Sequence, residues 1–104
     1  MKILVPGHRY VLDNFEDKQV AGQQLQFIHK EPIEQGNPKM TTISDGTTNE
    51  EVLAVLIDRM QFLQDRFPCR ENAIVITNLE ESLMWLNKRT ADRLQRGVEG
   101  RHEK

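Results

Sequence analysis

The 104-residue sequence has few cysteines, no long apolar run and no signal-peptide core, which are features typical of disulfide-rich, membrane-spanning and secreted proteins. It holds one cysteine, Cys69, so no disulfide can form within the chain, and a reducing compartment is expected. No apolar run approaches the ~20 residues that a transmembrane helix needs. The apolar run that precedes Pro6 and Gly7 is too short for the core of a signal peptide. We therefore expect a cytosolic protein.

Basic residues are not in excess either. The chain carries 14 lysines and arginines against 16 aspartates and glutamates, which gives a net charge of −2. Proteins that coat DNA or RNA carry a broad basic surface. We therefore expect neither polymeric nucleic acid nor a membrane as a partner, although a few local arginines would still suffice to bind a small anion.

The sequence also lacks the common motifs of catalysis and of metal binding. His8, His29 and His102 are far apart in the sequence, and Cys69 has no cysteine or histidine neighbour at the spacing of a zinc site. There is no Ser-His-Asp signature, no phosphate-binding loop and no dinucleotide fingerprint. We expect no enzymatic activity, no metal site and no cofactor.

Residues 1–44 have the pattern of short strands broken by turns. We expect a short strand at residues 3–5, a weak one at 10–14, the best one at 23–30, and a third or fourth at 40–44. Such strands form an antiparallel hairpin or meander. The fold class is therefore α+β, with a small N-terminal antiparallel sheet followed by helices.

Residues 45–97 predict a hairpin of two long helices. Thr48 is a good N-cap, and Glu51 stands three residues later, at the spacing of a capping box. Pro68 stops the first helix, and the short link that follows makes an antiparallel second helix at about residues 71–96. We expect one domain over residues 1–104, in which residues 98–104 form a flexible tail.

The apolar residues of the two helices predict how they pack. In the second helix a seam steps alternately by three and four residues, as in a coiled coil: Ile76, Leu79, Leu83, Leu86 and Thr90. The expected stripe of the first helix is Val52, Leu53, Val55, Leu56, Met60, Leu63 and Phe67. Four further apolar residues of the second helix lie off its seam: Ile74, Val75, Met84 and Trp85. They predict a second buried surface, against the sheet or against another subunit.

One stripe of the second helix could bind a nucleotide. Trp85, Arg89 and Arg93 are spaced at i, i+4 and i+8, close to one helix face, while Arg59 and Phe62 lie on the first helix. An aromatic plane can stack on a base, and a guanidinium can bind a phosphate through two hydrogen bonds. From the residues alone, a solvated face with arginines paired to nearby carboxylates is the better interpretation.

Three motifs in order give the chain a resemblance to a known family: DGTTNEEVL, FPCREN and MWLNKRT. Over residues 45–100, and more loosely over 9–31, the chain resembles the phage Thoeris anti-defence sponges of the first type. These share a helical-hairpin domain with the second type of anti-CBASS sponge. The resemblance implies homodimers, and in some members hexamers built as trimers of dimers. It also implies binding of glycocyclic ADP-ribose, the signal that host TIR-domain proteins make, without cleavage. Some hexameric members bind cyclic trinucleotides at separate sites as well.

The resemblance also implies four ligand-binding residues. Phe62 would stack on adenine, Asn72 would hydrogen-bond the polar edges of the ligand, and Arg89 and Arg93 would bind its pyrophosphate. Asn72 and Arg89 are separated by about 25 Å of helix at 1.5 Å per residue, so one ligand cannot reach both ends of a straight helix. We therefore expect a pocket shared between two subunits.

The predicted function is a sponge that sequesters glycocyclic ADP-ribose in the cytoplasm of the infected bacterial host and so blocks Thoeris immunity. Arg59 and Trp85 are additional candidates for this pocket. Lys39 and Arg9 are candidates for a second anion site, although no motif supports them. One alternative is a sponge for cyclic di- or trinucleotides, instead or in addition. Another is a helical hairpin that docks a protein partner.

Overall fold

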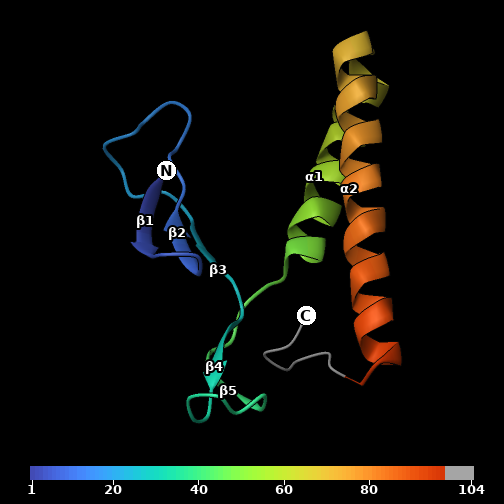
Figure 1. Ribbon diagram of the computed structural model, residues 1–104. Helices are drawn as coiled ribbons and strands as arrows, with labels where there is room; N and C mark the ends of the chain where they lie inside the picture. Colours follow the sequence, from blue (N-terminus) through green and yellow to red (C-terminus); the bar gives the residue numbers. More distant parts are fainter. Residues whose placement is uncertain (98–104) are drawn as a thin grey trace. The chain divides into compact units, whose positions relative to one another are not determined.

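The computed structural model describes residues 1–97 and has the predicted α+β class (Figure 1). Strands occupy the first part of the chain and two helices the second. The chain divides into two compact units, residues 1–48 and the part that starts at Asn49. The tail predicted at residues 98–104 lies outside the described residues. Neither described helix has the apolar length required to cross a membrane.

The first unit begins with an antiparallel sheet of three short strands. β1 (Lys2–Val5), β2 (Arg9–Val11) and β3 (Gln24–Gln26) lie in that order, each paired with the next. The turn between β1 and β2 passes through Gly7, whose φ of 79° is a conformation that glycine adopts without strain. The strand predicted at residues 3–5 is therefore confirmed. The one predicted at residues 10–14 is confirmed only in its first part, because β2 ends at Val11.

A separate two-stranded ribbon follows in the same unit. β4 (His29–Pro32) pairs antiparallel with β5 (Met40–Ser44), and the loop between them turns at Gly36, with a φ of 81°. The strand predicted at residues 40–44 is thereby confirmed.

The single strand predicted at residues 23–30 is wrong, because the structure divides this stretch between β3 and β4. At the junction, Phe27 donates its backbone N–H to the carbonyl of His8, and Ile28 donates to the carbonyl of Thr47. Phe27 also forms an isolated parallel bridge with Thr47. The backbone thus changes partners at Phe27. The alternating side-chain pattern cannot reveal this change, since it carries no information about which strand lies alongside.

The helical hairpin is present as predicted. α1 (Asn49–Arg66) begins directly after Thr48 and ends before Pro68, and α2 (Arg70–Gln95) follows a short turn. Gly97, with a φ of 74°, lies just beyond the end of α2 and donates its N–H to Leu94.

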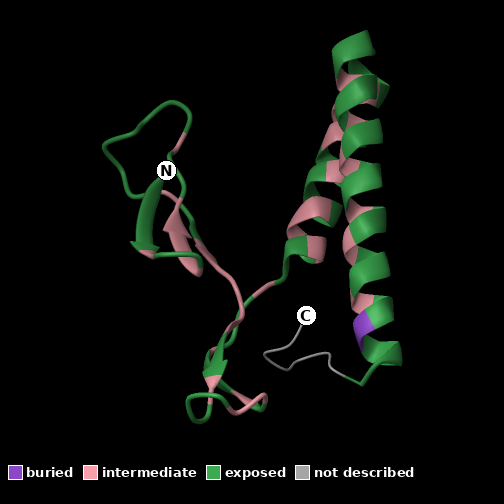
Figure 2. Ribbon diagram, viewed as in Figure 1, coloured by how far each residue is buried: buried purple, intermediate pink, exposed green. Residues whose placement is uncertain are grey.

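The seam predicted for α2 faces α1, since all five of its residues are half-buried. Figure 2 shows the half-buried positions on the sides where the helices meet and exposed positions on the outer sides. Asn72 and Arg93 extend this seam by one step at each end. The stripe predicted for α1 is partly wrong, because Val55, Leu56 and Phe67 are exposed. Ile57, which was not in the predicted stripe, is half-buried. Helix α1 therefore has apolar residues on two faces, and spacing alone does not distinguish them.

The turn of the hairpin is closed by the side chain of Gln64. Its Nε2 donates to the carbonyl of Cys69 at 3.1 Å, and its Oε1 accepts the N–H of Cys69 at 3.0 Å. Cys69 in turn caps α2, since its Sγ accepts the N–H of Asn72 at 3.4 Å. The single cysteine of the chain is therefore the N-cap of α2.

Replacing Gln64 with alanine is expected to lower the free energy of unfolding by about 1 kcal/mol, because two hydrogen bonds are lost and both are exposed to water, which competes for the same groups. Chemical denaturation followed by circular dichroism would measure this change. Gln61→Ala, at an exposed position one turn earlier in α1, is the matched control and should have little effect. Equal effects of the two substitutions would contradict the assigned role of Gln64.

Candidate functional site

The two helices of the hairpin differ in length. α1 has 18 residues and α2 has 26, so α2 is longer by eight residues, or about 12 Å. Both helices meet at the short turn, and α2 therefore continues past the first residue of α1 by roughly its last two turns (Figure 1). Arg89 and Arg93 lie on this overhang.

A hollow of about 330 Å³ lies along this end of α2. The described residues that line it are Trp85, Lys88, Arg89, Asp92, Arg93 and Arg96. Four of the six are cationic and one is anionic, so the hollow is positively charged. Its volume is at the low end of the range of ~300–1,000 Å³ for ligand sites.

The structure brings the predicted stripe into this hollow. The side chain of Trp85 is 56% exposed and Arg89 is exposed, whereas Arg93 is only 4% exposed and is engaged in an interaction. Asp92, one of the nearby carboxylates that could neutralise the stripe, accepts a hydrogen bond from Nζ of Lys88 at 3.0 Å. We call Trp85, Arg89 and Arg93 the arginine half-site.

Lys88 and Arg96 were not among the predicted site residues. Arg96 stands three residues after Arg93, and Lys88 three residues after Trp85, which is a helical spacing for neighbours. That spacing could have indicated both of them.

The remaining predicted ligand residues lie at the turn end of the hairpin. Phe62 lies one turn before the end of α1 and is 51% exposed, and Asn72 is half-buried in the first turn of α2. The guanidinium carbon of Arg66 is 4.7 Å from the centroid of the Phe62 ring, so one face of this ring is already covered. A stacked base would use the other face or displace Arg66. We call Arg59, Phe62 and Asn72 the turn half-site.

The hairpin keeps these two half-sites apart. Asn72 and Arg89 are 17 residues apart in one uninterrupted helix, a separation of about 25 Å. A single nucleotide cannot contact both half-sites of one chain.

The two candidates for a second anion site lie in the first unit. Arg9 is in β2, and its Nε donates to Oε1 of Gln26 at 2.6 Å. Lys39 is exposed in the loop before β5, where its backbone N–H donates to Oδ1 of Asn37 at 2.9 Å. Arg9 is thus already engaged with a neutral side chain.

Many of the large apolar residues of the hairpin are exposed. No hydrophobic residue within residues 1–97 is buried. The large hydrophobic residues exposed on the two helices are Val55, Leu56, Phe62, Ile74, Val75, Met84, Trp85 and Leu94. They include all four residues that the sequence places off the seam of α2.

Comparisons with known proteins identify the hairpin. A family model described as "Acb2/Tad1, hairpin domain" matches residues 30–91, which is more than half of the chain. A protein of Bacillus phage SBSphiJ7 named "Thoeris anti-defense 1" is 61% identical over 62 residues. The match covers 59% of this chain and 44% of the phage protein, so the chain spans less than half the length of this relative. Phe62, Asn72 and Arg89 fall within the region that the family model matches, and Arg93 lies two residues beyond it.

Proposed function

Because this chain belongs to the Acb2/Tad1 hairpin-domain family, as its motifs predicted, we propose that it is a phage anti-defence protein that sequesters a nucleotide signal. The signal is glycocyclic ADP-ribose, which the protein binds without degrading it in the cytoplasm of the infected host. Thoeris immunity is blocked because its effector never receives the signal. The name of the phage relative, "Thoeris anti-defense 1", supports this proposal.

The observation that carries the proposal is the convergence of an aromatic ring and arginines in the hollow on α2. Trp85, Arg89 and Arg93 share it, together with further cations. Guanidinium groups bind phosphate oxygens through paired, charge-assisted hydrogen bonds. A positively charged hollow beside an exposed indole therefore suits a ligand that combines a pyrophosphate with an adenine.

The complete pocket is formed by two subunits. An antiparallel second copy of the hairpin places the turn half-site of one chain against the arginine half-site of the other. The exposed apolar residues of the helices support this assembly, because a dimer would bury them. The small volume of the hollow supports it too, since a half-site needs to enclose only part of the ligand. The resulting assembly is a homodimer or a trimer of such dimers.

Tight capture requires more than the named contacts. A Kd near 1 nM corresponds to about −12 kcal/mol. Two arginine–phosphate contacts contribute ~1.5–3 kcal/mol each, and stacking of the base contributes ~1–3 kcal/mol. Enclosure of the ligand in a preformed cleft between subunits must contribute the rest. This requirement is a further reason to expect a shared pocket.

The experiment that tests the proposal separates capture from cleavage. The protein is incubated with glycocyclic ADP-ribose, passed through a desalting column and denatured by heat, and the released material is analysed by mass spectrometry. We expect to recover the unchanged ligand, at about one molecule for each pocket, where one pocket consists of one turn half-site and one arginine half-site. Recovery of a hydrolysed product would show an enzyme instead.

A thermal-shift screen distinguishes the rival functions. Ligand at 100 times its Kd stabilises a protein by about 2.7 kcal/mol, which raises the melting temperature by several degrees. A shift with cyclic di- or trinucleotides alone would make the protein a cyclic-oligonucleotide sponge. No shift with any of these compounds would favour a hairpin that docks a protein partner.

A further inference from the structure

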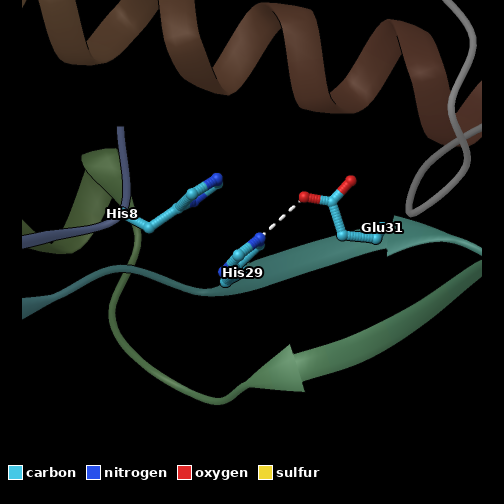
Figure 3. Close-up of side chains that lie close together, drawn as sticks. All are labelled: His8, His29 and Glu31. Atoms are coloured by element: carbon cyan, nitrogen blue, oxygen red, sulfur yellow. Dashed lines mark hydrogen bonds and ion pairs between the residues drawn. The ribbon is translucent and has the colours of Figure 1, made fainter. Parts of the chain in front are cut away.

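Two histidines and a glutamate that are far apart or unremarkable in the sequence converge in the first unit. His8 and His29 stack with ring centroids 3.6 Å apart and an angle of 7° between their planes. Oε1 of Glu31 lies 2.7 Å from Nε2 of His29. One ligand atom from each of the three residues lies within 4.8 Å of the other two. Figure 3 shows the rings side by side, with the carboxylate directed at His29.

The backbone fixes all three positions. His8 ends the turn between β1 and β2, where its N–H donates to the carbonyl of Val5 at 2.9 Å and its carbonyl accepts the N–H of Phe27 at 2.8 Å. His29 lies two residues after Phe27, so this second bond holds the two histidines side by side. Glu31 is two residues further along β4, and alternate residues of a strand project from the same face.

We propose that His8, His29 and Glu31 bind one divalent transition-metal ion such as Zn²⁺. Two imidazole nitrogens and one carboxylate oxygen are a common set of protein ligands for this ion, with the remaining position filled by water. Ca²⁺ and Mg²⁺ prefer all-oxygen sites and fit this set poorly. The carboxylate would exchange its hydrogen bond to His29 for a bond to the ion.

The ligand atoms are close to the arrangement that a metal requires. Around an ion with bonds of ~2.0–2.2 Å, neighbouring ligand atoms are about 3–3.5 Å apart. The three ligand atoms here lie within 4.8 Å of one another. Rotations about side-chain bonds would therefore be enough to bring them to the separations that an ion requires. The stacked rings must tilt away from parallel, so that the lone pairs of both nitrogens point at the same ion.

The ion would link two sheets that otherwise share little. His8 belongs to the turn of the three-stranded sheet, and His29 and Glu31 belong to the two-stranded ribbon. The first unit has 48 residues and no buried hydrophobic residue among those described. Units of this size commonly gain stability from a metal, a disulfide or a partner. A metal at this junction would stabilise the unit, and the proposal does not depend on the signal-binding role of the hairpin.

The test is a metal titration of the untagged full chain after treatment with a chelator. Zn²⁺ is followed by isothermal titration calorimetry and Co²⁺ by its visible absorption. We expect one ion per chain, a rise in melting temperature, and a loss of affinity of about tenfold or more in each of His8→Asn, His29→Gln and Glu31→Gln. Glu34→Gln, an exposed carboxylate three residues after Glu31, is the matched control and should bind as the parent does.

Two further measurements keep the result decisive. Cys69→Ser should leave the affinity unchanged, since this exposed thiol is the strongest alternative ligand in the described residues. The ring resonances of Tyr10, the single tyrosine, report the fold of the first unit, because this ring packs edge-on against Phe27 at 6.0 Å. If a histidine variant unfolds, Glu31→Gln decides the question. Unchanged affinity in all folded variants, loss of binding in Cys69→Ser, or no binding by the parent chain would each overturn the proposal.

Discussion

Replacing Arg89 and Arg93 together with alanine is expected to abolish capture of glycocyclic ADP-ribose. Each arginine–phosphate contact contributes ~1.5–3 kcal/mol, so the double variant should bind about 10²- to 10⁴-fold more weakly. Stacking on the aromatic rings would remain but cannot hold a ligand tightly by itself. Isothermal titration calorimetry of the parent and the variant would measure the difference, and the heat-release assay should recover no ligand from the variant.

Two companion variants make this result specific. Arg89→Lys with Arg93→Lys keeps both charges but loses the paired hydrogen-bonding geometry, so it should lose roughly tenfold rather than the full effect. Lys18→Ala removes an exposed cation of the first unit, outside both half-sites, and should leave capture unchanged. Gel filtration checks that the assembly is intact, because Arg93 is nearly buried. Parent-like affinity in a correctly assembled double-alanine variant would show that the arginine half-site is not the binding site.

The hairpin could be predicted closely from the sequence because its determinants are local. The capping-box spacing of Thr48 and Glu51, the break at Pro68 and the seam with steps of three and four residues are each patterns that lie within a few positions of the chain. Only the facing side of α1 was misassigned. Val55 and Ile57 are both apolar, and which of them meets α2 is decided by the partner helix rather than by spacing within α1.

The sheets could be predicted only in part because strand pairing is not local. The stretch of residues 23–30 alternates like one strand, yet its two halves pair with β2 and β5. The change of partner depends on hydrogen bonds to His8 and Thr47, which lie about twenty residues away in either direction. The same long-range contact brings His8 beside His29. A search for metal-ligand spacing along the sequence could not have found this pair.

The candidate site lies between these two cases. Helical spacing predicts that Trp85, Arg89 and Arg93 share a face, and the structure places all three in one hollow. The separation of Phe62 and Asn72 from these arginines follows from the rise of a helix. The sequence of one helix does not determine how a second chain would complete the site. This question requires an experiment on the assembled protein.

A mixing experiment is expected to restore binding from two inactive chains. One chain carries Phe62→Ala with Asn72→Ala, and the other carries Arg89→Ala with Arg93→Ala. When either variant chain assembles with itself, both pockets of the dimer lack one of their two half-sites. Neither homodimer therefore captures the signal. In a mixed dimer, one pocket lacks both half-sites while the other receives an intact turn half-site and an intact arginine half-site. Equal co-expression should therefore restore about a quarter of the parent's binding sites at parent affinity.

This outcome depends on the pocket being shared, which makes it informative in both directions. If each pocket were formed by a single chain, every pocket in every mixture would carry one damaged half-site, and mixing would restore nothing. The two variant chains carry different tags, and mixed dimers are purified through both tags in sequence. A titration with the ligand then gives the number of binding sites per chain. Purified mixed dimers should hold one ligand each, half the capacity of the parent dimer. Restored binding is expected because about 25 Å of rigid helix separates Asn72 from Arg89 in one chain. A second copy of the chain is then needed to bring the two half-sites together.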